Sequence, residues 1–190
     1  MKTKKWYDYL WVVEITYFVL GFFNILFAWI GMIFFVTPLA ISAIKGDKLY
    51  CNRYCGRGQL FAKLGSKFSR NRPMPPFFRT PYFRYGFLAF FMAMFFNMIF
   101  ATYLVFAGVS SLSETLTLLW TFKVPWAFAN TSGVTTWIAQ YAFGFYSVMM
   151  TSTILGIVTM VLFKPRGFCV YCPMGTMTQG ICKLKHKGES

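Results

Sequence analysis

The chain has 190 residues, of which 57% are hydrophobic and 22% aromatic, while only 13% are charged. A soluble domain of this length could not bury so much apolar surface, so the composition favours an integral membrane protein. The formal net charge is +14, but the basic residues are concentrated between apolar blocks, which is typical of membrane loops rather than of nucleic-acid-binding surfaces. We therefore predict no nucleic-acid partner and expect the basic segments to contact anionic lipids.

The first apolar block, residues 10–44, exceeds one ordinary span of roughly 17–25 residues and is barely long enough for two. We predict one long span near Tyr17–Ile44, preceded by an interfacial aromatic belt in which Glu14 snorkels to the membrane surface. A helical hairpin that turns near Asn24 or Gly31 is the alternative, and it would give four spans in all.

The second and third apolar blocks, residues 85–109 and 136–163, each match the length of one transmembrane helix. Between them lies an outer connection, residues 110–135, which we expect to lie along the interface or to dip into the membrane without crossing it. The predicted fold class is therefore all-α: a single membrane domain with three transmembrane helices.

The charges of the loops predict the orientation. Residues 45–84 carry ten basic residues and one acidic residue, and the tail, residues 164–190, is also basic. The connection carries only Lys123 and Glu114. Because basic loops are retained inside, we place the first loop and the tail on the cytoplasmic side of the cell (inner) membrane. Three spans leave the N-terminal lysines outside, against this rule, and the hairpin alternative removes that conflict.

Two cysteine pairs lie in these cytoplasmic segments, in the runs Cys51-Asn-Arg-Tyr-Cys55 and Cys169-Val-Tyr-Cys172. Residues three or four apart on a helix or tight turn point the same way, so each pair can act as a clamp. Structural disulfides are disfavoured in the cytoplasm, and this favours metal ligation or redox work. The two clamps together supply four thiolates, enough for one [4Fe–4S] or [2Fe–2S] cluster, so we predict that all four cysteines are ligands.

The residues around the pairs fit the same interpretation. Tyr54–Gly58 aligns with Tyr171–Gly175 as an internal repeat, and its glycines would let backbone N–H groups approach inorganic sulfur. Nearby basic residues would offset the negative charge of a cluster and raise its reduction potential; they are Lys48, Arg53, Arg57 and Arg166. The fifth cysteine, Cys182, is expected to be an unligated thiol, with a substitute ligand or a ligand to a second cluster as the alternative.

These motifs resemble the membrane-bound 4Fe–4S-binding family that includes the NapH-type and NosR-type electron-transfer proteins. The matching residues are Cys51, Cys55, Gly58, Cys169, Cys172, Pro173 and Gly175. Two features depart from the family pattern, since Gly56 replaces a proline and the second pair is C-x2-C rather than C-x3-C. The resemblance implies electron passage between a cytoplasmic donor and a quinone or an extracytoplasmic acceptor.

We therefore expect an iron–sulfur electron-transfer subunit of a larger membrane redox complex, with a soluble ferredoxin or flavoprotein as donor. No general acid–base constellation is evident, so whether the chain is itself an enzyme stays open. Two alternatives remain. Four thiolates in two short pairs also suit a structural zinc site in an assembly subunit. The Cys169/Cys172 pair could instead be the redox dithiol of a quinone-linked thiol–disulfide oxidoreductase.

Overall fold

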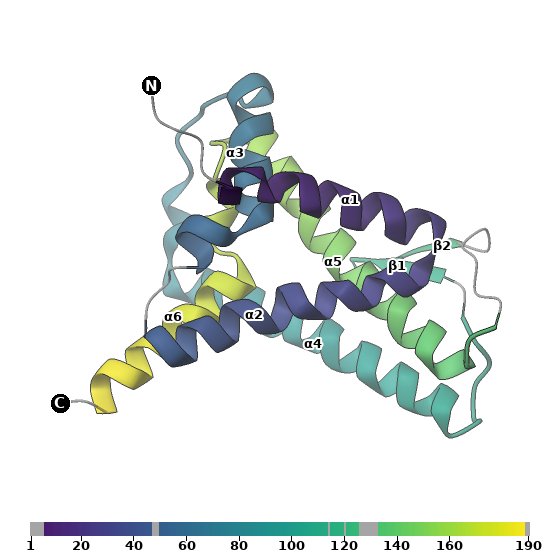
Figure 1. Cartoon of the computed structure of the whole chain (residues 1–190). Coiled ribbons are helices and arrows are strands. Elements are labelled where there is room, and N and C mark those ends of the chain that lie inside the picture. Colours follow the sequence, from purple (N-terminus) through teal and green to yellow (C-terminus); the bar gives the residue numbers. More distant parts are fainter. Residues whose placement is uncertain (1–5, 47–49, 114, 120, 126–132, 189–190) are drawn as a thin grey trace. The chain divides into compact units, whose positions relative to one another are not determined.

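The computed structural model describes residues 6–46, 50–113, 115–119, 121–125 and 133–188. Most of this chain is helical (Figure 1). The main helices are α1 (Leu10–Phe23), α2 (Ile30–Lys45), α3 (Gly56–Phe68), α4 (Pro81–Phe106), α5 (Thr136–Leu162) and α6 (Pro173–Gly188). Two short strands lie between α4 and α5, namely β1 (Thr115–Leu118) and β2 (Phe122–Pro125). Short helical turns occupy Trp6–Tyr9, Ile25–Trp29, Tyr50–Tyr54, Pro76–Arg79 and Gly167–Val170.

The chain forms two units. The cysteine unit comprises Met1–Ile15, Phe34–Leu88 and Leu155–Ser190, and it contains both cysteine motifs. The hairpin unit comprises Thr16–Ile33 and Ala89–Ile154, and it contains both strands.

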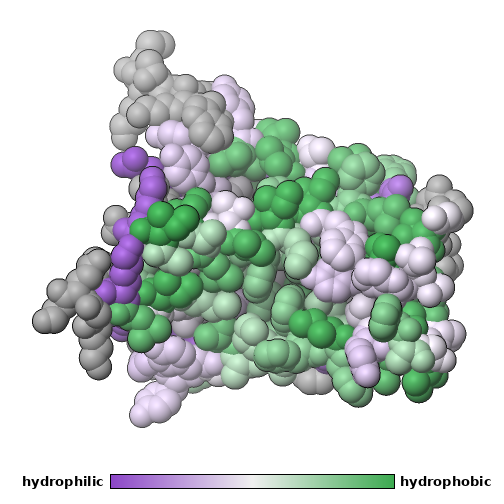
Figure 2. Space-filling view, turned by 60° about the horizontal axis from the view of Figure 1, so that its bottom comes forward, coloured by the Kyte–Doolittle hydropathy of each residue, from purple (hydrophilic) through white to green (hydrophobic). Residues whose placement is uncertain are grey.

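Three helical stretches are long and apolar enough to cross a membrane: Ile25–Lys45, α4 and α5. Hydrophobic side chains cover much of the face shown in Figure 2. The two later blocks agree with the sequence prediction to within a few residues. The α4 helix begins at Pro81, a residue suited to the first helical position, and the Thr80 hydroxyl oxygen accepts the Phe83 N–H. Gly108, with φ of +73°, follows the end of this helix.

The first block differs from the prediction of one long span near Tyr17–Ile44. The helix ends at Phe23, and the Asn24 side chain accepts the Leu26 N–H to start a 3₁₀ turn. The Tyr17 hydroxyl lies 3.5 Å from the Ala28 carbonyl, although eleven residues in a continuous helix would separate them by about 16 Å. The chain therefore reverses at Asn24, which is the hairpin alternative.

The outer connection contains β-structure, so the expectation of an all-α chain is wrong for this segment. Strands β1 and β2 pair antiparallel, with Thr117 opposite Lys123. The alternating Thr-Leu-Thr-Leu sequence of β1 has the two-residue period of a strand that is buried on one face. Leu116 is on that buried face, with 1% of its surface exposed.

The hairpin lies along α5 (Figure 1). Its backbone bonds to polar side chains of that helix: the Ser147 hydroxyl donates to the Thr117 carbonyl, and the Leu119 N–H donates to the Thr151 hydroxyl. In its most apolar window α5 is 61% buried, against 22% for α4. It is therefore the central helix of the hairpin unit.

The cysteine unit has an aromatic core. Its buried members are Phe61, Met74, Met160, Phe168 and Tyr171. The Tyr171 and Thr159 hydroxyls form a buried hydrogen bond of 2.5 Å, so the phenol is satisfied inside this core. Since Phe168 precedes Cys169 and Tyr171 lies between Cys169 and Cys172, the core holds the turn that carries the second cysteine motif.

Helix α3 approaches the segment after α5 at Gly65. A Cβ at this glycine would lie 2.6 Å from the Pro165 Cβ and 2.7 Å from its Cα. We expect Gly65→Ala to lower the free energy of unfolding by about 1–3 kcal/mol, because the proline backbone cannot move aside. The matched control is Gly86→Ala in α4, where a Cβ meets nothing within 4 Å and should stabilise the helix by about 0.5–1 kcal/mol. Thermal unfolding followed by tryptophan fluorescence separates the two, and equal melting temperatures would contradict this packing.

Candidate metal centre

Each cysteine motif ends in the same local structure, a cysteine that precedes a helix. Cys55 is the N-cap of α3, and its sulfur accepts the Gly58 N–H at 3.4 Å. Cys172 precedes α6, and its sulfur accepts N–H groups of Met174 and Gly175. The predicted repeat is therefore also a structural repeat, in which the positive end of a helix faces a cysteine sulfur.

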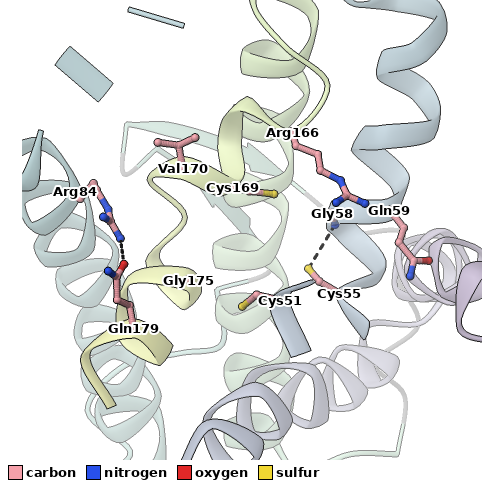
Figure 3. Close-up of a pocket in the computed structure, with 10 residues that line it drawn as sticks. All are labelled: Cys51, Cys55, Gly58, Gln59, Arg84, Arg166, Cys169, Val170, Gly175 and Gln179. Atoms are coloured by element: carbon pink, nitrogen blue, oxygen red, sulfur yellow. Dashed lines mark hydrogen bonds between the residues drawn. The ribbon is translucent and has the colours of Figure 1, made fainter. Parts of the chain in front are cut away.

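Three of the four predicted ligands line one cavity of about 480 Å³ in the cysteine unit: Cys51, Cys55 and Cys169. Figure 3 shows their sulfur atoms in this cavity, together with Gly58 and Arg166. Cys51 comes from the turn before α3, and its sulfur lies 3.7 Å from the Thr178 hydroxyl of α6. The two motifs, more than a hundred residues apart in sequence, thus contribute to the same site.

Gly58 brings the motifs close together. A Cβ built on this residue would lie 3.6 Å from the Cys55 sulfur and 3.7 Å from the Cys169 sulfur. The missing side chain therefore leaves open space between one cysteine of each pair. Gly58 is buried, and its N–H already donates to Cys55.

Cys172 lies outside the cavity lining but close to the other three cysteines in charge interactions. It is less exposed than Cys169. Its charge nevertheless interacts with those of Cys51 and Cys55, and Cys169 interacts with both Cys172 and Cys51. All four predicted ligands therefore share one electrostatic environment.

That environment opposes free thiolates. Burial raises the pKa of Cys55 to about 12 and that of Cys169 to about 11, and it raises the pKa of Cys172 as well. Neighbouring cysteines act in the same direction as burial, whereas the Arg57 charge and the Gly58 N–H favour the thiolate of Cys55. Four thiolates here would need a bound cation to balance them.

Arg57 is not part of the cavity lining, but its charge acts on Cys55 and Cys172. Its guanidinium pairs with the Glu14 carboxylate, with Nη2 and Nε each 2.9 Å from Oε1. Burial opposes the charged form of Arg57, yet Glu14 outweighs burial and raises the pKa of the guanidinium. The prediction that Glu14 snorkels to the membrane surface is wrong, because its side chain is buried against this arginine.

Two further polar side chains reach the cavity with an unsatisfied atom. The Nε of Arg84 and the Oε1 of Gln59 are buried, and neither has a partner among the described residues. The other end of each group is fixed: Arg84 Nη2 donates to Gln179 at 2.5 Å, and Gln59 Nε2 donates to the Tyr7 carbonyl at 2.8 Å. Each of these two cavity-lining residues thus keeps one buried polar atom without a partner among the described residues.

Among the described residues, no group of three or more Cys, His, Asp or Glu side chains is already in metal-binding geometry. The cysteine sulfurs share one site without forming a closed ligand set. Cys182 is buried in α6 outside the cavity lining. Lys48 lies outside the described residues, while Arg166 lines the cavity as the sequence indicated.

Sequence reasoning missed the parts of the site that depend on tertiary contacts. Arg84 was counted only as one of many basic loop residues, and Gln179 and Thr178 carried no signal at all. A weak signal existed for Glu14, since an isolated acid beside an apolar block requires a partner.

Comparison of the chain with protein-family models, with curated proteins and with solved structures finds no match. The resemblance of the cysteine motifs to the membrane-bound 4Fe–4S-binding family therefore stays a prediction.

The buried Arg57–Glu14 pair should be energetically coupled. Glu14→Gln and Arg57→Gln each leave one buried charge without its partner, so each should lower the free energy of unfolding by about 3 kcal/mol. The double variant should lose clearly less than the sum of the two. Chemical or thermal unfolding of the four proteins measures the coupling, with Lys67→Gln on the exposed face of α3 as the control. Strictly additive losses would mean that the pair does not hold α1 against the motif.

Proposed function

We propose that this protein holds a [4Fe–4S] cluster, with Cys51, Cys55, Cys169 and Cys172 as ligands. The observation that carries this proposal is the arrangement of two cysteine-capped helix starts around one cavity. Cysteine thiolates are the ligands of such clusters, and backbone N–H groups that point at the sulfurs tune their potentials.

The contents of the cavity fit a cluster better than a single ion. A zinc ion bonds thiolates at about 2.3 Å and would draw the four sulfurs close together. The cavity that three of the four cysteines line has instead a volume of about 480 Å³. The unpaired Arg84 Nε is a suitable donor to an inorganic sulfide, and the gap beside Gly58 leaves room for a cluster edge.

When bound, the cluster would supply one-electron transfer. The chain's own residues would set its properties. Arg57 and Arg166 offset negative charge, and the N–H groups of Gly58 and Gly175 bond to ligand sulfurs. Cys169 is the most exposed of the four ligands, so it marks the side from which electrons would enter or leave.

We infer that the work of the protein is electron transfer as one subunit of a membrane redox complex. A soluble ferredoxin or flavoprotein is the proposed donor, because such proteins are commonly acidic and the cysteine unit is strongly basic. A quinone or an extracytoplasmic protein is the proposed acceptor. These partners follow from the family resemblance and the charge, and they depend on the presence of the cluster.

The proposed location is the cell membrane, with both motifs on the cytoplasmic side. We propose four membrane segments: α1, Ile25–Lys45, α4 and α5. The contacts of Glu14 with Arg57 and of Lys63 with the Trp11 ring, at 3.6 Å from its centroid, support this arrangement because they join the start of α1 to the cytoplasmic loop. With the chain reversed at Asn24, the N-terminal basic residues fall on the same side as the other basic segments, in agreement with the positive-inside rule.

The ligand assignment is tested by anaerobic purification with iron and acid-labile sulfide analysis and by EPR of the reduced protein. We expect iron and sulfide in the intact chain and a signal of a reduced cluster. Cys51→Ser combined with Cys169→Ser should abolish both, because one ligand is lost from each pair. The matched control, Cys182→Ser, should retain them. Zinc without sulfide in the intact protein would overturn the cluster.

The topology is tested by reporter fusions. Green fluorescent protein placed after residue 190 should fluoresce, and alkaline phosphatase inserted after Ser110 should be active, because the first reporter requires the cytoplasm and the second the outside. Fluorescent protein fused before residue 1 should also fluoresce if the chain has four membrane segments. A dark N-terminal fusion that is still produced at normal levels would favour three segments.

A further inference from the structure

A second cavity, of about 300 Å³, lies in the hairpin unit and has no part in the proposed cluster site. We call it the hairpin cavity. Side chains of α4, α5 and the β-hairpin line it, among them Met94, Asn97, Met98, Lys123, Gln140 and Ser147. On α4 and α5 these residues lie in the half of each helix that is nearer to the connection between the two helices.

Two polar side chains that line this cavity, Gln140 and Lys123, can donate hydrogen bonds to a ligand. The Gln140 Oε1 already accepts the Ser113 N–H at 2.9 Å, so the amide NH₂ is the part of this side chain left for a ligand. The Ser147 hydroxyl donates to the Thr117 carbonyl. Lys123 adds an ammonium group, which has three donors and no acceptor. A ligand with oxygen acceptors can therefore pair with Gln140 and Lys123, whereas the Ser147 oxygen and the Asn97 amide can also accept hydrogen bonds.

The charge of the lining points to an anion. Lys123 is the one charged side chain among the described residues that line the cavity. Glu114, the other charged residue of the connection, lies outside the described residues. Lys123 is exposed, so its charge is open to an anion from outside the chain. Beside apolar helices of membrane-spanning length such a charge is costly unless an anion or water balances it.

The remaining lining is apolar. Met94 and Met98 of α4 are buried, and Met98 packs against Gly144 of α5, where a Cβ would come within van der Waals overlap of its side chain. Methionine is flexible and polarisable, so it adapts to chains of irregular shape. The cavity thus combines a basic, donor-rich part with an apolar floor.

The placement of the hairpin supports a ligand site. Bonds from Ser147 and Thr151 hold the hairpin beside α5, and Thr151 is about 22 Å along that helix from Thr136. A bilayer core is about 30 Å thick. Non-helical backbone at such depth is tolerated where it is covered by protein or lines a polar cavity. Leu116 of β1 is buried and Thr117 and Lys123 line the cavity, while most of β2 is exposed.

We propose that the hairpin cavity binds the anionic head of an acyl amphiphile, a carboxylate or a phosphate. Lys123 pairs with the negative charge, the Gln140 amide donates to a head-group oxygen, and the acyl chain contacts Met94 and Met98. This site differs from the general contact of basic loops with anionic lipids, because it is one cavity on the outer side with one cation. The proposal rests on the membrane placement proposed above and is independent of the cluster.

The experiment measures binding to the purified full-length protein in a neutral detergent, by native mass spectrometry and by ligand-induced change in melting temperature. The probes are oleate, dioleoylphosphatidylglycerol, dioleoylphosphatidylcholine and inorganic phosphate. We expect one tightly retained anionic amphiphile, with at least tenfold weaker retention of phosphatidylcholine and of phosphate alone. Oleate and phosphatidylglycerol are the two sources of the same head-group chemistry, and their relative affinities identify the source.

The decisive variant is Lys123→Gln, which should weaken binding at least tenfold and remove the dependence on head-group charge. Lys123→Arg keeps the charge and should retain binding, and it serves as the test if Lys123→Gln does not fold. Lys67→Gln, in the cysteine unit, is the matched control and should bind like the unaltered chain. Glu114→Gln removes a negative charge next in sequence to Ser113, which lines the cavity. Anion binding should therefore be unchanged or tighter in this variant.

Several outcomes would overturn the proposal. They are unchanged binding in Lys123→Gln, equal affinity for phosphatidylcholine and phosphatidylglycerol, and phosphate binding as tight as that of the amphiphiles. Displacement of the amphiphile by a neutral quinone at equal concentration would likewise assign the cavity to a different ligand. Because Cys51→Ser with Cys169→Ser should bind the amphiphile normally, failure of the cluster and failure of this site are distinguishable.

Discussion

The cysteine unit depends on one repeated interaction, the hydrogen bond from a helix-start N–H to a cysteine sulfur. At Cys55 the donor is Gly58, and at Cys172 the donors include Gly175. The interaction does two things at once. It gives each helix a cap, which satisfies N–H groups that otherwise lack partners, and it fixes each sulfur at the positive end of a helix. Because the same cysteine serves both purposes, the positions of α3 and α6 and the position of the proposed ligands cannot vary independently.

The second constraint is electrostatic. Arg57 follows Cys55 by two residues, and Glu14 is its partner from α1. This pair lets a positive charge lie buried behind the cysteines, where it favours the thiolate of Cys55. Burial of the thiols acts the other way and raises their pKa values. Burial thus opposes four free thiolates, while an arginine and helix N-termini would share the charge of the proposed ligand set.

The sequence predicted the bounds of helices and the cysteine repeat well, but it predicted poorly which distant residues contact each other. The bounds of α4 and α5 followed from uninterrupted apolar runs, and the cysteine repeat followed from residue spacing. The break at Asn24 was considered but not preferred, because the first apolar block is barely long enough for two spans. What decided it was a side-chain cap and the contact of Tyr17 with Ala28, which appear only when the chain has reversed. Glu14 was misplaced for the same reason, since its partner is more than forty residues away in sequence.

A few polar side chains of the apolar helix α5 determine where the β-hairpin lies. Gln140, Ser147 and Thr151 are spaced by seven and four residues, so they lie on one face of α5. In the sequence they appear only as isolated polar residues in a long span, for which bonding to another helix is the ordinary expectation. In the structure they bond instead to the backbone of the connection, at Ser113, Thr117 and Leu119. Among the described residues, strands β1 and β2 form a two-stranded sheet, and these side chains satisfy backbone groups that would otherwise face apolar surroundings. The polar face of α5 therefore sets how far the hairpin extends along the helix, and with it the position of Lys123.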